Sequence, residues 1–122
     1  MRQPRGRWRR GAVGALALAS LGVVGCSHGT ERRVINIVVN DKGSAGFSPE
    51  LTTVHKGAKV RLVVRNRTTK VHGFTIVGYK VPPLEVAPEK LNNLPFTAKK
   101  AGTFQIRCQL HPQHRTAVLV VE

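Results

Sequence analysis

A cysteine and two histidines lie within one short segment near the C-terminus, Cys108-Gln-Leu-His111-Pro-Gln-His114. A further histidine, His72, begins an earlier β-rich segment that follows a polar loop. A cysteine with two histidines and a weaker axial group is typical of copper sites that transfer electrons. We therefore predict a copper site built from these side chains. A rigid scaffold would hold nearly the same geometry for Cu(I) and Cu(II), which keeps the barrier to electron transfer low.

Each of these residues also has an ordinary structural role open to it. Cys108 could be a buried thiol, because free cysteines are among the most buried side chains. His111 could be a surface loop residue, and His72 could end a strand without contacting a metal. The remaining histidines, His28 and His55, lie in a predicted tether and beside a predicted turn, and we expect neither to be a ligand.

The elements that must position these residues are predicted to be short β-strands. The length of 122 residues and the apolar fraction of 41% predict one compact domain. Short β-rich runs separated by turn residues, with no run of helical period outside the N-terminal segment, predict an all-β sandwich or barrel. An irregular, proline-containing connector is expected over residues 81–88. The predicted strands are Val34–Val39, Phe47–Val54, Val60–Val64, His72–Val77, Leu94–Ala98, Thr103–Cys108 and Ala117–Val121.

The N-terminal segment has the pattern of an export signal. Arginines crowd residues 2–10, and residues 11–25 carry no charge, which is the layout of a secretory signal peptide. The stretch Val23-Val24-Gly25-Cys26 then resembles a bacterial lipobox, in which the cysteine is acylated and becomes the new N-terminus. We therefore predict a lipoprotein-type signal peptide over 1–25, a lipidated tether over 26–33 that carries the lipid on Cys26, and a domain over 34–122.

Other interpretations of this segment stay open. An uncleaved anchor, or a plain signal peptide with an incidental cysteine, fits the same pattern. The Arg9-Arg10 pair followed by Gly11 leaves twin-arginine export and general secretion both open. A lipidated Cys26 leaves Cys108 without a disulfide partner, which indicates a free thiol, an intermolecular bridge or a metal ligand. An unlipidated chain could instead form a Cys26–Cys108 disulfide.

The net charge of the chain limits the classes of partner that it could bind. The chain carries 20 lysines and arginines against 6 acidic residues, a net charge of +14. Five of the basic residues belong to the predicted signal peptide, so the mature chain would keep a net charge of +9. A basic chain can bind nucleic acid, but export and the lack of aromatic residues interleaved with basic ones argue against it. The surplus charge suits anionic lipid headgroups or an acidic redox partner.

The C-terminal segment resembles the metal-binding loop of the cupredoxins, the small blue copper proteins, and especially the amicyanin type, Cys-x-x-His-Pro-x-Met. Residues 34–122 contain further motifs in the order and spacing usual for the family. These motifs are Phe47-Ser48-Pro49, Lys56-Gly57, Asn66, His72-Gly73-Phe74 and Ala101-Gly102-Thr103-Phe104. The resemblance implies a Greek-key β-sandwich of about seven to eight strands, similar to amicyanin and plastocyanin, that holds one copper ion.

The resemblance also implies a role for each candidate ligand. His72, Cys108 and His111 would be the equatorial ligands, and His114 stands where the family usually has an axial methionine. An imidazole is a stronger donor than a thioether, so a bound His114 would pull copper out of the trigonal plane, favour Cu(II), lower the potential and shift the colour away from blue. Alternatively, His114 turns to solvent and leaves a three-coordinate or water-bound site. Gln113 is one position away from the axial place and fits less well.

A second departure from the family pattern is Gly73. Many small blue proteins have asparagine directly after the first histidine, where it ties the two ligand loops together. The His-Gly-Phe sequence is instead similar to the dinuclear copper domains of cytochrome oxidase subunit II and nitrous oxide reductase. Those domains need two bridging cysteines, whereas residues 34–122 contain Cys108 alone. We therefore expect a mononuclear site, looser than a typical blue one because the asparagine tie is missing.

The function that follows is one-electron transfer by a mononuclear copper protein, tethered by lipid to a membrane on the periplasmic or cell-surface side. A copper carrier without redox cycling, and a metal-free interaction domain with the same fold, are the alternatives. We expect no enzyme activity, because the sequence has no evident Ser–His–Asp frame and no carboxylate pair at telling spacing. The expected partners are a redox protein of acidic surface and the membrane, with the chain as a monomer and no nucleic acid bound.

Overall fold

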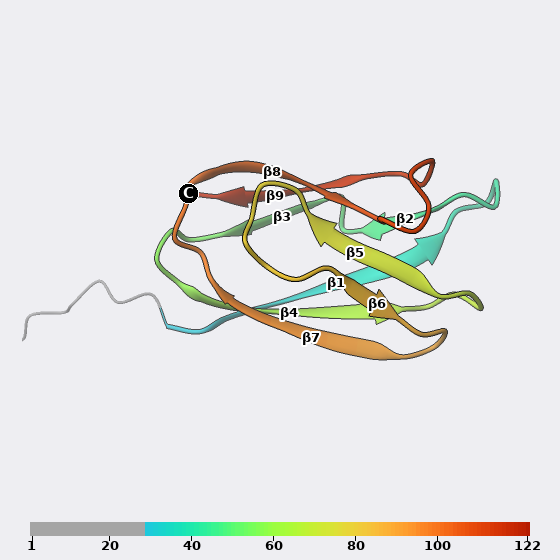
Figure 1. The fold of residues 1–122 in the computed structure, drawn as a ribbon, viewed down its shortest axis with the longest axis horizontal. Helices are drawn as coiled ribbons and strands as arrows, with labels where there is room; N and C mark the ends of the chain where they lie inside the picture. Colours follow the sequence, from blue (N-terminus) through green and yellow to red (C-terminus); the bar gives the residue numbers. More distant parts are fainter. Residues whose placement is uncertain (1–28) are drawn as a thin grey trace, which may run out of the picture.

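The computed structural model describes residues 29–122, which form β-strands and no helix (Figure 1). The predicted signal peptide and Cys26 lie outside the described residues. None of the described residues belongs to a helix long and apolar enough to cross a membrane. The strands are β1 (Glu31–Val39), β2 (Ala45–Ser48), β3 (Leu51–Val54), β4 (Lys59–Asn66), β5 (His72–Ile76), β6 (Leu84–Val86), β7 (Leu91–Thr97), β8 (Gly102–Arg107) and β9 (Ala117–Val121).

The strands form two sheets. One sheet has the order β2-β1-β4-β7, and the other has the order β3-β9-β8-β5-β6. The pairs β1–β4 and β3–β9 are parallel, and the remaining pairs are antiparallel. The prediction of an all-β sandwich is therefore confirmed, with nine strands over residues 29–122 where seven to eight were expected.

The core lies between the sheets because each strand turns apolar side chains to one face. In β9, Ala117, Leu119 and Val121 are buried and alternate with half-buried residues. Such alternation is typical of a strand that packs one face on the core and leaves the other partly exposed. Phe74 of β5 is fully buried and meets Phe47 of β2 edge to face, with ring centroids 5.7 Å apart. This contact joins the two sheets.

The predicted strand Phe47–Val54 is wrong as a single element. Its first part belongs to β2, which pairs with β1, and its second part is β3, which pairs with β9 in the other sheet. The chain crosses between the sheets at Pro49, whose missing amide cannot continue a ladder, and the Ser48–Pro49 bond is cis. The predicted connector 81–88 contains a short strand, β6, which the sequence analysis missed.

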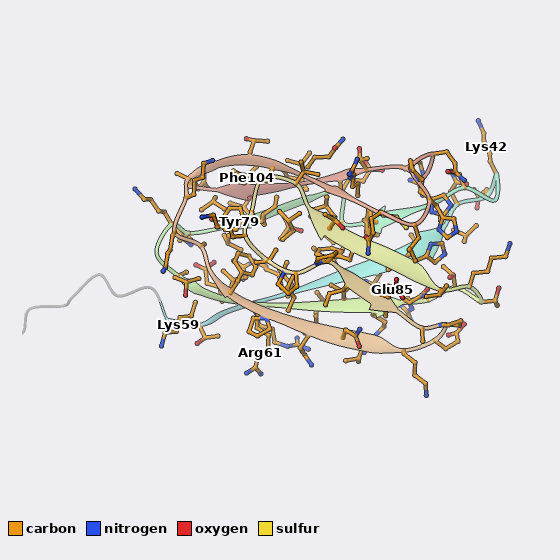
Figure 2. All side chains as sticks on the ribbon, viewed as in Figure 1. Lys42, Lys59, Arg61, Tyr79, Glu85 and Phe104 are labelled. Carbon is orange, nitrogen blue, oxygen red and sulfur yellow. The ribbon has the colours of Figure 1, made fainter. Side chains whose placement is uncertain are left out.

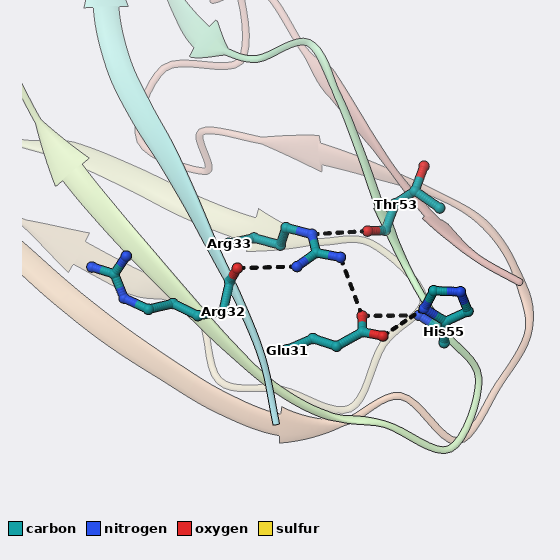
Figure 3. A network of polar contacts seen from close by, with 5 residues as sticks. All are labelled: Glu31, Arg32, Arg33, Thr53 and His55. Carbon is teal, nitrogen blue, oxygen red and sulfur yellow. Dashed lines mark hydrogen bonds and ion pairs between the residues drawn. The ribbon is translucent and has the colours of Figure 1, made fainter. Parts of the chain in front are cut away.

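The first strand begins at Glu31, earlier than the predicted strand start at Val34. A polar network at this point explains the earlier start (Figure 3). The Glu31 carboxylate accepts a hydrogen bond from the His55 backbone amide at 3.1 Å and contacts the His55 ring. Arg33 donates to the Thr53 carbonyl oxygen at 3.1 Å and pairs with Glu31 at 3.5 Å. These contacts hold the start of β1 against β3 of the other sheet.

Candidate metal centre

The four predicted metal ligands come together at one end of the sandwich, called here the metal end. His72 is the first residue of β5, and Cys108, His111 and His114 lie in the loop between β8 and β9. The donor atoms of these four residues all lie within 4.8 Å of one another. Bonds of about 2.0–2.3 Å to a common metal place two donors roughly 3–4.5 Å apart, so the spacing fits one ion.

The histidine rings pack around a common point. The ring centroid of His72 lies 5.4 Å from that of His111 and 5.1 Å from that of His114. The His111 and His114 rings stack with their centroids 4.5 Å apart. His72 Nδ1 and His114 Nδ1 are buried and have no hydrogen-bond partner. A buried nitrogen without a partner is costly unless something binds it. These nitrogens are therefore suited to a metal.

Electrostatics keep these imidazoles in the form that binds metal. Burial lowers the pKa of His72, and the neighbouring His114 and His111 rings and Lys70 lower it further. Burial and the His111 ring likewise lower the pKa of His114. A lowered pKa favours the neutral imidazole at neutral pH, and metal ligation requires the neutral ring. The folded chain thus presents these two histidines ready to bind.

Cys108 completes the donor set. Its side chain is buried, and its sulfur lies 3.5 Å from His111 Nδ1. The backbone amide of Gly73 donates a hydrogen bond to this sulfur at 3.1 Å. This hydrogen bond holds the Cys108 sulfur in place beside the His111 ring. Cysteine and three histidines are a donor set that suits copper.

The two ligand segments are tied together by Gln109, which the sequence analysis missed. Thr75 of β5 donates a hydrogen bond to Gln109 Oε1 at 2.7 Å, and Gln109 Nε2 donates to the Leu84 carbonyl oxygen of β6 at 2.8 Å. The side chain lies over Gly73, where a Cβ atom would overlap its amide group. Gly73 therefore leaves the space that the Gln109 side chain occupies. The chain has no asparagine after His72 to connect the two ligand segments, and Gln109 makes this connection instead. The pairing of glycine after His72 with glutamine after Cys108 was the available signal.

The loop that leads into His72 is held by a buried asparagine. Asn66 Nδ2 donates to the carbonyl oxygens of Lys70 at 2.7 Å and Val86 at 2.9 Å. Asn66 Oδ1 accepts hydrogen bonds from the Thr68 amide at 2.9 Å and from the Thr68 hydroxyl at 2.7 Å. Asn66 is 1% exposed, so these bonds are shielded from water. They fix the turn that places His72 at the head of β5.

Arg115 holds the other side of the ligand loop. Its backbone amide donates to the Ala45 carbonyl oxygen at 3.0 Å, and its guanidinium group pairs with Glu50 at 3.5 Å. The side chain packs on Gly46 of β2, where no Cβ atom stands in its way. The loop from Cys108 to Arg115 is thus connected to both sheets.

A cavity of about 550 Å³ opens beside the histidines. His72, His111 and His114 form part of its wall, and the cations Arg67 and Lys70 stand among its other lining residues. Gln113 also lines this cavity and is exposed. The centre therefore has one side that water and small solutes can approach.

Of the two histidines that were not predicted as ligands, His55 contacts Glu31 at the opposite end of the sandwich and takes no part in the centre. The other, His28, lies outside the described residues. Within residues 29–122, Cys108 is a free cysteine.

The profile of the cupredoxin-like domain family matches residues 13–121. The chain belongs to this family. The family membership and the geometry therefore both support a cupredoxin sandwich with a histidine–cysteine donor set. A search of curated proteins found no match to the sequence.

Solved structures of copper proteins share the fold of this cupredoxin at low sequence identity. The copper nitrite reductase of Nitrosomonas europaea is 17% identical, with a TM-score of 0.65 over 76% of this chain and 41% of that chain. The metal-binding domain of the Cu(I)-exporting P-type ATPase CopA of Streptococcus pneumoniae D39, solved with Cu(I), is 12% identical, with a TM-score of 0.64 over 79% of this chain and 89% of that chain. A copper-binding protein solved in the apo form is 18% identical, with a TM-score of 0.60 over 79% and 91%.

The chain spans only part of the larger enzymes that share its fold. It covers 29% of a multicopper oxidase from Pseudomonas thermotolerans, at 17% identity and a TM-score of 0.63. Identities this low establish the sandwich fold alone. The function of this cupredoxin must therefore be argued from its own site.

Proposed function

We propose that this chain is a mononuclear copper cupredoxin that transfers single electrons outside the cytoplasm while a lipid on Cys26 holds it to a membrane. The observation that carries the proposal is the donor set of His72, Cys108, His111 and His114, two of them buried and two half-buried, with its donor atoms within 4.8 Å of one another. Copper bound there supplies one-electron exchange between Cu(II) and Cu(I).

The residues around the donors limit how far the site moves. Gly73 donates to the Cys108 sulfur, and Gln109 connects the following loop to β5 and β6. Asn66 and Arg115 hold the two flanking turns. A donor set fixed in this way needs little rearrangement when the charge of its ion changes, and small rearrangement favours fast electron exchange.

We assign His114 as the fourth ligand. Its Nδ1 atom is buried without a hydrogen-bond partner, and its ring stacks on that of His111 at 4.5 Å. A side chain turned to solvent would have its nitrogens hydrated. The burial of the His114 Nδ1 atom therefore favours the bound alternative, with a lower potential than a site with axial methionine.

The metal end also offers a surface for a partner. Leu110 and Val71 are exposed beside the ligands, 37% and 43% respectively, and Arg67 and Lys70 are exposed nearby. Apolar contacts surrounded by cations suit a redox protein whose docking face is acidic. Electron transfer to that partner, with this chain as a monomer, is the proposed activity, and no catalysis is assigned to the chain.

Copper carriage is the second candidate, and the cavity of about 550 Å³ beside the histidines favours it. An ion that must be handed to another protein needs an open approach for the incoming ligands. In that case the same four residues hold copper, and the cavity receives the donor or acceptor chain.

The test is to load the purified protein with Cu(II) and record visible absorption and electron spin resonance for the wild type and for Cys108→Ser. We expect an intense thiolate-to-copper band that the variant lacks. If no such band forms in the wild type, both copper functions are wrong. Reversible voltammetry of the loaded protein would support electron transfer, and irreversible loss of copper on reduction would support carriage.

A further inference from the structure

Exposed cations gather at the end of the sandwich opposite the metal end, called here the basic end. It consists of the start of β1, the turn between β3 and β4, the connector after β5 and the turn between β7 and β8. Its exposed cations are Arg32, Lys56, Lys59, Lys80, Lys99 and Lys100. Of the two acidic residues described at this end, Glu31 is already paired with Arg33 and His55, and Glu122 is exposed. The basic end therefore carries a strong positive surplus.

Hydrogen bonds and strand register bring these segments together. Lys59 of β4 stands opposite Thr97 of β7, and the Lys56 amide donates to the Glu122 carbonyl oxygen at 2.7 Å. The Lys100 amide donates to the Tyr79 hydroxyl at 3.1 Å, which joins the β7–β8 turn to the connector after β5. Figure 2 shows Lys59 and Lys42 at opposite ends of the molecule.

Aromatic side chains stand among these cations. A cavity of about 610 Å³ at the basic end is lined by Tyr79, Phe96 and Lys80, together with Lys99 and Lys100. The half-buried Tyr79 ring packs against Phe96 at 5.5 Å and against Phe104 at 4.6 Å. Tyrosine with lysine at a surface is a combination enriched where proteins meet the headgroup layer of a membrane.

The sequence before β1 favours a bilayer over a protein as the occupant. From Cys26 to Glu31 the chain advances five residues, which extend at most roughly 18 Å. A lipid on Cys26 would therefore hold the start of β1, and the basic end with it, close to the lipid surface. Lysines within a Debye length of anionic headgroups are attracted to them.

We propose that the basic end lies against an anionic bilayer surface and that the metal end consequently faces away from the membrane. This inference rests on the proposed lipid anchor at Cys26. The orientation leaves the ligands and the exposed Leu110 accessible to a protein partner in solution.

The test measures the reactivity of the chain's own lysines. The full chain with its anchor is placed in vesicles of phosphatidylcholine, with or without phosphatidylglycerol, and labelled with an amine-reactive ester, and each lysine is quantified by mass spectrometry. We expect Lys59, Lys80, Lys99 and Lys100 to react several-fold more slowly when phosphatidylglycerol is present, and high salt to restore their reactivity. Lys42 and Lys90, which lie away from the basic end, should react equally in both vesicles.

Matched charge variants sharpen the test. Lys99→Glu combined with Lys100→Glu should abolish the protection of Lys59 and Lys80, whereas Lys42→Glu combined with Lys90→Glu should leave it intact. If neither vesicle lowers the reactivity of the basic end relative to protein without vesicles, the orientation is overturned and this surface is left to an acidic protein. Protection that is the same without phosphatidylglycerol would overturn the electrostatic attraction. A chain that fails to float with any vesicle would overturn the anchor itself, which separates failure of the tether from failure of the orientation.

Discussion

Gly73 and Gln109 should behave as a coupled pair, because a side chain at the first position and the glutamine amide at the second claim the same space. A Cβ atom at Gly73 would overlap Gln109 Oε1 and lie 2.7 Å from Nε2. In Gly73→Ala the amide must move away, which breaks its hydrogen bonds with Thr75 and Leu84. At about 1 kcal/mol net for each bond, the free energy of unfolding should fall by about 2 kcal/mol.

The double variant separates this mechanism from a general effect. Gln109→Ala alone removes the same two hydrogen bonds and should also cost about 2 kcal/mol. With the amide gone, the methyl group of Gly73→Ala has room, so the double variant should cost about 2 kcal/mol rather than the additive 4 kcal/mol. The coupling energy is therefore about 2 kcal/mol in favour of the double variant.

Urea denaturation of the metal-free protein, followed by far-ultraviolet circular dichroism, measures all three variants. Gly29→Ala is the control, because nothing lies within 4 Å of its Cβ position, and it should leave the free energy of unfolding unchanged. Additive costs in the double variant would refute the reasoning, since they would mean that Gln109 does not occupy the space above Gly73. In the copper-loaded proteins, the thiolate-to-copper band should be narrower in the wild type than in Gln109→Ala, because that variant has lost the hydrogen bonds that connect the ligand loop to β5 and β6.

Three further results are expected. Asn66→Ala should lower the free energy of unfolding by about 2–4 kcal/mol in urea titration, because the buried partners of its four hydrogen bonds are left unpaired. A loss below about 0.5 kcal/mol would contradict the buried network. His114→Met should shift the absorption of the copper-loaded protein toward blue and raise its potential in voltammetry, whereas unchanged values would exclude His114 as a ligand. The free energy of unfolding of the metal-free protein should fall as the pH falls below 6.5, because folding lowers the pKa of His72. Below this pH the His72 side chain is protonated in the unfolded chain but stays neutral in the folded chain, so protonation favours unfolding. Urea denaturation at pH 7.5 and at pH 5.5 measures this change in the free energy of unfolding. In His72→Phe the difference between the two pH values should be much smaller.

The sequence predicted that the candidate donors lie together because three of them are local. Cys108, His111 and His114 follow one strand within a single loop, so their proximity needs no knowledge of the rest of the chain. The fourth, His72, was placed by its position at the head of a β-rich run. The strand positions were likewise visible in short apolar runs, and β9, which is apolar at every position, is the clearest case.

Elements that depend on distant partners were not predictable in the same way. The run Phe47–Val54 looks continuous in sequence, yet β2 and β3 pair with different sheets, because the partners β1 and β9 lie far apart along the chain. The short strand β6 exists because it pairs with β5, and its own three residues carry no periodic signal. The Glu31 network begins β1 early through a contact with His55, which lies 24 residues later.

The sequence by itself determined which donors are available, that they suit copper, and that an all-β domain carries them, because residue chemistry and local hydrophobic patterning are properties of short segments. Only the tertiary structure decided how the donors are held. Gln109 can tie Cys108 to β5 because β8 pairs with β5, and Gly73 is needed because Gln109 lies above it. The structure also decided which exposed cations share the basic end, since strand register sets which turns lie at the same end of the sandwich.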